Sequence, residues 1–264
     1  LGTTGFWSGR NTKLEQCILK AVSDYGITVI DTAEMYGYGR SETETGHILK
    51  KAGREAIYLV DKIHPDNMTE GKFERSLDSS LQRLGTDYID LYLLHWRENV
   101  SLPLLVQKME EAKKQGKIRE WGVSNFDLPD LEELLACGGE NCYCNQIFYC
   151  IYERGCELKL LPYMEEHHIL CMSYSSLGSN YHPHPDINRN RNIMDFCSTD
   201  QIEPENIMLR FLQEKGAVTL FSTRSLKHLE DNLKDIPREI YRKSAIILDQ
   251  EYPAPPIPYS LVKI

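Results

Sequence analysis

The stretch DTAEMYGYGRSE, from Asp31 to Glu42, begins with a carboxylate at the exit of the apolar run Ile27–Ile30. Such a run, rich in β-branched residues, is typical of a buried strand. A buried carboxylate costs several kcal/mol unless a cation or hydrogen-bond donor meets it. Tyr36 follows within the same stretch, just before a glycine-rich turn. The stretch therefore predicts a polar site at the end of a strand, in which Asp31 has a cationic partner.

The same pattern of strand, loop and helix recurs along the chain. Amphipathic stretches of helical length, such as Phe73–Leu84 and Leu102–Lys114, separate short apolar runs. The predicted strands are Leu1–Thr4, Ile27–Ile30, Ile57–Val60, Tyr88–Leu94, Ile118–Val123, Cys144–Tyr149, Ile169–Tyr174 and Ala217–Phe221. Eight strands with helices between them in 264 residues predict an α/β fold, a (β/α)8 TIM barrel, as a single domain over residues 1–264.

An open, doubly wound sheet is the competing architecture. Gly37 and Gly39 follow a strand and precede a helix, as in a dinucleotide fingerprint, but Glu42 occupies the position of the third glycine. The two glycines therefore predict a tight turn, and the barrel is the preferred interpretation. The pattern Ser41-Glu-Thr-Glu44 is that of a capping box, which predicts a helix start at this point.

Composition and charge exclude several classes of protein. The net charge is −9 and no run of Lys or Arg stands out, which argues against nucleic-acid binding. No apolar segment approaches the roughly 20 residues that cross a membrane. Zinc ligands usually come in paired spacings, and the five clustered cysteines do not match them. We therefore expect a cytoplasmic protein without a stoichiometric metal, with reduced thiols at Cys137, Cys142, Cys144, Cys150 and Cys156.

Polar side chains stand at the exits of successive predicted strands, and these exits meet at one end of a barrel. They are Asp31 with Tyr36, Lys62, His95, Ser124 with Asn125, Gln146 and Tyr174. Each alone has an ordinary structural explanation, such as a capped turn, a solvated charge or a histidine satisfied in the core. Four of them on three consecutive strands together favour a catalytic site.

Four of these residues suit acid catalysis. A phenol has a pKa of about 10, so Tyr36 is a weak acid unless a cation stabilises its phenolate. We expect Lys62 to be that cation and to lower the pKa of Tyr36, while Asp31 balances the ammonium charge. His95 adds a donor that orients a substrate carbonyl. This arrangement suits the reduction of an aldehyde or ketone once a cofactor supplies hydride.

Over essentially its full length, the chain resembles the aldo-keto reductase family. The resemblance is carried by DTAEMYGYGRSE, the strand that ends at Lys62, LGTDYIDLYLLHW, GKIREWGVSNF, NQIFY, SYSSLG and LEDNL. It implies that Asp31, Tyr36, Lys62 and His95 are the catalytic tetrad of an NAD(P)H-dependent carbonyl reductase.

The resemblance also implies a cofactor site. The nicotinamide carboxamide would be held by Ser124, Asn125 and Gln146, and Tyr174 would stack on the nicotinamide ring. The pyrophosphate would lie at the turn formed by Ser175, Ser176, Leu177, Gly178 and Ser179. The adenine end would contact Ser222, Thr223, Arg224, His228, Asp231 and Asn232. The remaining predicted cofactor contacts are Gly2, Thr3, Thr4 and Asp31.

Some positions depart from the family's pattern. Asp61 precedes the predicted catalytic lysine, where Thr or Ser is common. Ser222 stands where some members carry a phosphate-binding lysine, and His228 replaces an arginine. Arg224 and Thr223 remain as ligands for a 2′-phosphate, which predicts a modest preference for NADP(H), with NAD(H) also used. The N-terminal hairpin of this family is absent from the sequence as given.

The predicted substrate is a small carbonyl compound bounded by Phe6, Trp7, Trp96 and the segment Asn180–Phe196. The polar composition of that segment fits an anionic substrate and a solvated loop equally well. One alternative function is a cofactor-binding regulatory or sensor protein on the same fold, like the potassium-channel β-subunits of the family. Another is a metal-dependent barrel hydrolase, but the strand ends lack a His/Asp ligand set.

Overall fold

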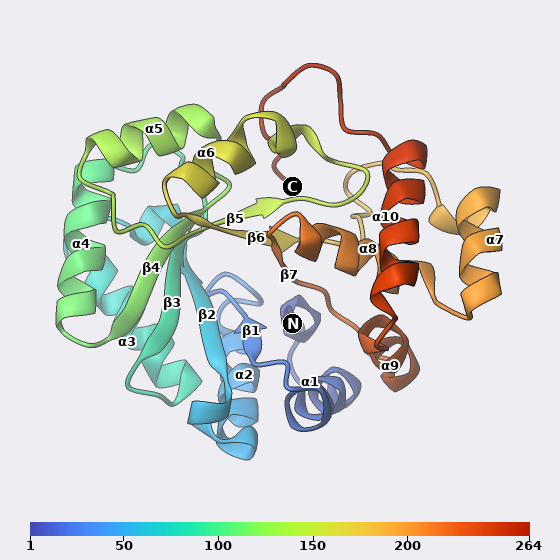
Figure 1. Cartoon of the computed structure of the whole chain (residues 1–264). Helices are drawn as coiled ribbons and strands as arrows, with labels where there is room; N and C mark the ends of the chain where they lie inside the picture. Colours follow the sequence, from blue (N-terminus) through green and yellow to red (C-terminus); the bar gives the residue numbers. More distant parts are fainter. The chain divides into compact units, whose positions relative to one another are not determined.

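The apolar runs form parallel strands, and the amphipathic stretches form helices beside them (Figure 1). This architecture is seen in a computed structural model that describes residues 1–264. The chain divides into two compact parts. The N-terminal unit comprises Leu1–Asn145 and Ser222–Ser225, and the C-terminal unit comprises Gln146–Phe221 and Leu226–Ile264. The single domain over residues 1–264 stays a prediction.

The N-terminal unit is built on four strands that follow one another in chain order. They are β1 (Val29–Asp31), β2 (Tyr58–Ile63), β3 (Ile89–Leu94) and β4 (Ile118–Ser124). Each is parallel to the next, with Asp31 beside Val60, Lys62 beside Leu93, and Leu94 beside Val123. The carboxyl ends of these strands therefore lie along one edge of the sheet, where the predicted catalytic residues stand.

Five α-helices accompany these strands: α1 (Thr12–Tyr25), α2 (Arg40–Ala52), α3 (Phe73–Leu84), α4 (Leu102–Lys114) and α5 (Leu128–Ala136). Helices α3 and α4 have the bounds predicted from their amphipathic patterns. Helix α2 packs against both α1 and α3 (Figure 1). Short 3-10 turns complete the unit at η1 (Thr4–Phe6), η2 (Arg54–Ala56) and η3 (Pro65–Asn67).

The first predicted strand, Leu1–Thr4, is reduced to a single parallel bridge between Gly2 and Asp31. The backbone N–H of Thr3 donates to the carbonyl of Asp31 at 3.0 Å, and the N–H of Asp31 donates to the carbonyl of Leu1 at 2.9 Å. The segment thus lies along β1, but it turns into η1 before a ladder can extend. The structure has seven strands where eight were predicted, so the α/β class is confirmed and the count of eight is not.

Helix α2 begins at Arg40 and not at the predicted capping box. Its N-cap is Gly39, with a left-handed φ of 85°, and no side chain caps the helix. Ser41 and Glu42 are instead fully buried, and Glu42 forms an ion pair with Arg83 of α3 at 2.6 Å. The capping-box prediction is wrong because Ser41 lies inside the helix, where its hydroxyl bonds to Thr3 and Thr32 and does not cap the helix end.

The C-terminal unit continues the alternation. The strand β5 (Cys144–Phe148) leads into it, and β6 (Leu170–Tyr174) is parallel to β7 (Val218–Thr219). Its helices are α6 (Leu160–Glu166), α7 (Arg191–Asp200), α8 (Pro204–Glu214), α9 (Leu226–Leu233) and α10 (Arg238–Glu251), with η4 (Gly155–Leu158) and η5 (Ile187–Arg189). Helix α8 packs against α7, α9 and α10. No helix of the protein is both long and apolar enough to cross a membrane.

Candidate active site

All four predicted catalytic residues belong to the N-terminal unit and stand at the carboxyl ends of its strands. Asp31 is the last residue of β1, Lys62 is the penultimate residue of β2, and His95 follows β3 directly. Tyr36 lies in the turn between β1 and α2. The parallel register brings these residues together, as the strand-end argument predicted.

Lys62 is fully buried and is surrounded by oxygen atoms. Its ammonium donates to Asp31 Oδ1 at 2.7 Å, to the carbonyl of Thr32 at 2.9 Å and to Tyr36 Oη at 3.4 Å. Burial acts to lower the pKa of Lys62, but attraction to Asp31 and Tyr36 outweighs it and raises that pKa. Lys62 is therefore charged at neutral pH, and Asp31 has the cationic partner that its position required.

The phenol of Tyr36 is the predicted proton donor, which this cation can assist. Burial raises the pKa of Tyr36 above its ordinary value, and the neighbouring Lys62 opposes this rise without reversing it. Desolvation of the phenolate is the larger effect here. Tyr36 is consequently protonated at neutral pH, as a general acid must be before it acts. The expectation that Lys62 brings this pKa below its ordinary value concerns the holoenzyme and stays a prediction.

His95 is held beside these groups as a neutral ring. Burial, with smaller contributions from the positive charges of Lys62 and His64, moves the pKa of His95 well below its ordinary value. The imidazole stacks on Trp96, with ring centroids 3.9 Å apart and an interplanar angle of 9°. Its ring also meets Tyr36 edge-on at 5.7 Å. A neutral imidazole still donates one N–H, which suits the orientation of a carbonyl oxygen.

Two of the three predicted substrate contacts lie near this group. Trp96 covers His95, and the half-exposed Trp7 has its ring centroid 6.3 Å from that of Tyr36. Phe6 is instead buried in the unit, at 1% exposure. The backbone of Trp7 also packs closely on Gly37, since a Cβ built on Gly37 would lie 2.1 Å from the Trp7 carbonyl oxygen.

His64 and Glu34 belong to the site and were not identified from the sequence. The ring of His64 meets Trp96 edge-on at 5.8 Å. His64 follows Lys62 by two residues, so the alternation of side chains along β2 could have indicated it. The carboxylate of Glu34 accepts hydrogen bonds from the backbone N–H of His64 at 2.5 Å, from Asn67 at 2.9 Å and from the hydroxyl of Ser76. No sequence signal distinguishes Glu34 from a surface acid.

Ser124 and Asn125 extend the site at the end of β4. Asn125 has a left-handed φ of 61°, a conformation that Asn tolerates better than most residues. Its amide nitrogen donates to the backbone carbonyl of His95 and to Ser124 Oγ, both at 3.1 Å. Both side chains are buried polar groups fixed beside the predicted catalytic histidine. A hydroxyl and an amide in this position fit the carboxamide of a nicotinamide.

The other predicted cofactor residues divide between the two units. Those in the N-terminal unit, beside Asp31, Ser124 and Asn125, are Gly2, Thr3, Thr4, Ser222, Thr223 and Arg224. Those in the C-terminal unit are Gln146, Tyr174, Ser175, Ser176, Leu177, Gly178, Ser179, His228, Asp231 and Asn232. The hydroxyl of Thr3 is fully buried and hydrogen-bonded within its unit. The side chains of Ser222 and Arg224 are exposed.

Within the C-terminal unit, the residues after β6 form a defined turn. Ser175 has a φ of 50° and Gly178 a φ of 95°, and the N–H of Gly178 donates to the carbonyl of Ser175 at 2.8 Å. Tyr174 stacks on Phe148 with ring centroids 5.9 Å apart. A flat ring beside a turn rich in hydroxyl and N–H groups fits a nicotinamide ring followed by a pyrophosphate.

Asn206 fixes the end of α9, where the predicted adenine contacts lie. Its amide nitrogen donates to the backbone carbonyls of Asp231 at 2.8 Å, Asn232 at 3.2 Å and Lys234 at 2.8 Å. The carboxylate of Asp231 forms an ion pair with Lys227 at 2.6 Å. The segment is therefore held in place by the protein itself.

Asp61, which departs from the family's pattern, lies fully buried next to Lys62. No side chain donates to its carboxylate oxygens, and the backbone N–H of Lys62 is the neighbouring donor. Burial, together with the nearby negative charge of Glu42, raises the pKa of Asp61 well above its ordinary value. Burial in the interior of the N-terminal unit therefore favours the neutral form of the Asp61 carboxyl group.

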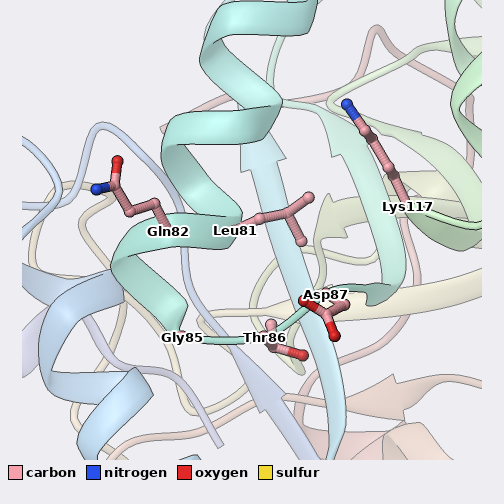
Figure 2. A pocket seen from close by; sticks show the side chains of 6 residues that line it. All are labelled: Leu81, Gln82, Gly85, Thr86, Asp87 and Lys117. Carbon is pink, nitrogen blue, oxygen red and sulfur yellow. The ribbon is translucent and has the colours of Figure 1, made fainter.

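A surface groove lies at the opposite end of the same strands. It has a volume of about 420 Å³ and is lined by Leu81, Gln82, Gly85, Thr86, Asp87 and Lys117 (Figure 2). Asp87 precedes β3 and Lys117 precedes β4, so the groove borders the amino ends of these strands. It is separate from the catalytic residues, which stand at the carboxyl ends.

All eight cysteines are free thiols. Burial raises the pKa of Cys142 and Cys171 to about 12 and that of Cys150 to about 11, so these thiols are protonated and unreactive at neutral pH. No group of three or more His, Cys, Asp or Glu side chains is arranged to hold a metal ion. The absence of a stoichiometric metal stays a prediction.

The parallel strands bring together the buried Lys62, its partner Asp31, the phenol of Tyr36 and the neutral imidazole of His95. This arrangement fits an α/β enzyme for acid-assisted carbonyl chemistry. The model of the aldo/keto reductase family matches residues 1–249, and the chain belongs to this family. The predicted family is thus confirmed.

The chain is similar to characterised members of the family. It is 35% identical over 245 residues to methylglyoxal reductase YeaE of Escherichia coli (strain K12), an alignment that covers 92% of this chain and 86% of that protein. It is 33% identical over 174 residues to an NADH-specific methylglyoxal reductase of the same organism, with 58% and 53% covered.

A solved structure extends the likeness to the whole chain. The crystal structure of an aldo/keto reductase from Klebsiella pneumoniae, in complex with NADP and acetate, has a TM-score of 0.91 and 31% identity, and covers 100% of this chain and 94% of that one. The chain is an NAD(P)H-dependent oxidoreductase that reduces carbonyl compounds. No finding supports a sensor protein.

Proposed function

We propose that this enzyme reduces a small aldehyde or ketone to an alcohol with Tyr36 as the proton donor. The observation that carries the proposal is the contact of Tyr36 Oη with the buried Lys62 ammonium at 3.4 Å. Lys62 is in turn held by Asp31 at 2.7 Å. An acid of this kind contributes about 10²–10⁴-fold to the rate of a proton transfer.

The residues have distinct roles in this reaction. When bound, NAD(P)H supplies the hydride that is added to the carbonyl carbon. Tyr36 donates its proton to the carbonyl oxygen, and Lys62 stabilises the phenolate that remains. Asp31 keeps Lys62 charged, and the neutral His95 orients the carbonyl oxygen toward Tyr36. In alcohol oxidation the roles reverse, and Tyr36 must then begin as the phenolate.

Cofactor binding is assigned to residues of both units. Ser124, Asn125 and Gln146 would hold the nicotinamide carboxamide, Tyr174 would stack on its ring, and the turn of residues 175–179 would bind the pyrophosphate. Further contacts would come from Gly2, Thr3, Thr4, Asp31, Ser222, Thr223, Arg224, His228, Asp231 and Asn232. Arg224 and Thr223 favour NADP(H), and the NADP-bound neighbour from K. pneumoniae supports this preference. The similarity to an NADH-specific reductase is the reason to keep NAD(H) as a second cofactor.

We also propose that the strands close into a (β/α)8 barrel, with residues 1–4 in the position of the first strand. The bridge between Gly2 and Asp31 supports this position. The TM-score of 0.91 to the K. pneumoniae reductase over the whole chain supports the barrel.

The proposed substrate class is small aldehydes and ketones bounded by Trp7 and Trp96, with methylglyoxal as the first compound to test. The name of the E. coli relative supports methylglyoxal. Consumption of NADPH over many turnovers should be measured with a panel of aldehydes and ketones. Turnover of at least one carbonyl compound is expected. Tight NADPH binding without turnover of any of them would instead favour the sensor alternative. The cytoplasmic location stays a prediction.

A further inference from the structure

A chain of buried hydroxyl groups lies next to the turn that carries Tyr36. Thr32 Oγ1 donates to Ser41 Oγ at 3.1 Å, and Ser41 Oγ lies 2.8 Å from Thr3 Oγ1. Thr3 Oγ1 also donates to the carbonyl oxygen of Asp31 at 2.9 Å. All three hydroxyl-bearing side chains are fully buried. In this low-dielectric interior the bonds are strong, and an unmade bond is costly.

The protons of this chain can be assigned so that every donor has an acceptor. Each hydroxyl donates one proton and accepts up to two. Thr32 donates to Ser41, and Thr3 donates to Asp31. Ser41 donates to Thr3, either to its hydroxyl oxygen or to its carbonyl oxygen at 3.0 Å. Removal of the Ser41 oxygen would leave the buried Thr32 hydroxyl without its acceptor, so Ser41 is the central member.

Ser41 also holds the turn through its backbone. Its N–H donates to the carbonyl oxygen of Tyr36 at 3.2 Å. Its side chain meanwhile binds Thr32, the first residue after β1. Ser41 therefore fixes the turn between β1 and α2 at two points, at Thr32 where the turn begins and at Tyr36.

We propose that Ser41 is a positioning residue for the proton donor: its hydroxyl holds the turn against β1 and so keeps Tyr36 Oη in contact with Lys62. This rests on the proposed role of Tyr36. The distance between Tyr36 Oη and Lys62 Nζ is 3.4 Å, near the outer limit for a hydrogen bond. A small displacement of the turn is therefore enough to break the contact.

The chain offers a matched control one helical turn away. Thr45 is also fully buried on α2, and its hydroxyl donates to the carbonyl of Ser41 at 2.7 Å. This bond lies within the helix and does not reach the turn or β1. Thr45→Val therefore removes a buried hydroxyl from the same helix without removing a link to Tyr36.

The test compares Ser41→Ala, Thr32→Val and Thr45→Val with the wild type. Misplacement of a reacting group by about 1 Å can cost about 10²-fold, so kcat for carbonyl reduction should fall by about that factor in Ser41→Ala. Thr32→Val should act in the same direction and less strongly. The dissociation constant of NADPH, measured by fluorescence titration, should stay near the wild-type value in all three. Thr45→Val should retain the wild-type kcat.

The pH dependence of alcohol oxidation separates positioning from a general loss of stability. Oxidation requires the Tyr36 phenolate, and Lys62 favours that phenolate. A weakened contact should therefore move the apparent pKa of oxidation upward in Ser41→Ala and in Thr32→Val. A merely structural role would lower the amount of folded enzyme and leave this pKa unchanged.

The proposal is overturned if folded Ser41→Ala and Thr32→Val match Thr45→Val in kcat and in the apparent pKa. If circular dichroism shows that Ser41→Ala does not fold, the test is made with Thr32→Val, because valine has nearly the same shape as threonine. Its kcat and its apparent pKa of oxidation are then compared with those of Thr45→Val. The wild type is tested first. If it reduces no carbonyl compound, the result counts against the proposed function and not against the role of Ser41.

Discussion

Lys62 and Asp61 are neighbours on β2 and are equally buried, yet their surroundings favour the charged form of Lys62 and the neutral form of Asp61. The ammonium of Lys62 has three oxygen partners, and its pKa is raised, so it keeps its charge. The carboxyl group of Asp61 has no side-chain partner, with only the backbone N–H of Lys62 beside it, and burial raises its pKa, which favours the neutral form. Adjacent residues of a strand project to opposite faces, which is why the two environments differ.

The difference shows that burial does not by itself decide the protonation state of an ionisable group. Removal from water disfavours the charged form of both residues. Asp31 and Tyr36 compensate Lys62, whereas Glu42 adds further negative charge near Asp61. Lys62 can therefore act in chemistry at neutral pH, and Asp61 imposes a cost on folding that depends on pH.

Removal of the Lys62 charge should have the largest effect on activity and stability. In Lys62→Met, Asp31 loses its cation and Tyr36 loses the group that stabilises its phenolate. Breaking a buried ion pair costs about 3–5 kcal/mol, and loss of assisted acid catalysis should lower kcat by at least about 10²–10⁴-fold. Urea unfolding and steady-state kinetics measure the two effects. Lys117→Met, which removes a more exposed lysine paired with Asp78, is the control and should change neither by much.

Removal of the acid alone should be nearly as damaging to activity and much less damaging to stability. Tyr36→Phe deletes only the phenolic oxygen, so kcat for reduction should fall by about 10²–10⁴-fold. Cofactor affinity by fluorescence titration should barely change. Tyr38→Phe, two residues away and 91% exposed, should behave as the wild type. Near-normal reduction by Tyr36→Phe would leave the mechanism without its proton donor.

Arg224 differs from both Lys62 and Asp61 because its charge is exposed to solvent. Arg224 is exposed, and its predicted partner is the 2′-phosphate of the cofactor. Charge-assisted hydrogen bonds of this kind are worth about 1.5–3 kcal/mol, or roughly 10- to 100-fold in affinity. Arg224→Ala should therefore remove most of the preference for NADPH over NADH. An unchanged ratio of the two dissociation constants would show that Arg224 is not the ligand.

Replacing the uncompensated acid by an amide should change stability in the opposite direction. The folded pKa of Asp61 lies well above the unfolded value of about 3.9. Between these two values the folded state holds a proton that the unfolded chain has lost, so the free energy of unfolding falls as pH rises. Asp61→Asn should remove this decline, so its free energy of unfolding should exceed that of the wild type by more at pH 8 than at pH 5, the difference growing by at most about 1.4 kcal/mol per pH unit. Urea unfolding at pH 5 and pH 8 measures it, and an unchanged pH dependence would contradict a protonated Asp61.

The grouping of the proposed catalytic residues could be predicted from the sequence because the strand ends indicated them. Asp31, Lys62 and His95 each end an apolar run, and parallel strands bring such ends to one edge. The direction of the Tyr36 pKa could not be predicted, because it depends on how completely the phenol is buried. His64 and Glu34 were missed since their roles arise from contacts with Trp96 and with the backbone of neighbouring loops.

Local sequence signals failed where tertiary contacts were stronger. Ser41 and Glu44 have the pattern of a capping box, but Ser41 lies inside α2 and bonds to Thr3 and Thr32. Residues 1–4 read as a strand, but only one bridge forms before η1 begins. In both places the partner lies at least nine residues away, which a local pattern cannot register.

The protonated carboxyl group of Asp61 gives this enzyme a natural spectroscopic label. A carboxylic acid absorbs in the infrared at a frequency distinct from that of carboxylates and amides, and the frequency responds to hydrogen bonding. The carboxyl group of Asp61 receives no hydrogen bond from a side chain, so its band should report any water or side chain that enters the interior beside Lys62. A difference spectrum against Asp61→Asn would isolate that band, and cofactor binding could then be followed from inside the protein without an added probe.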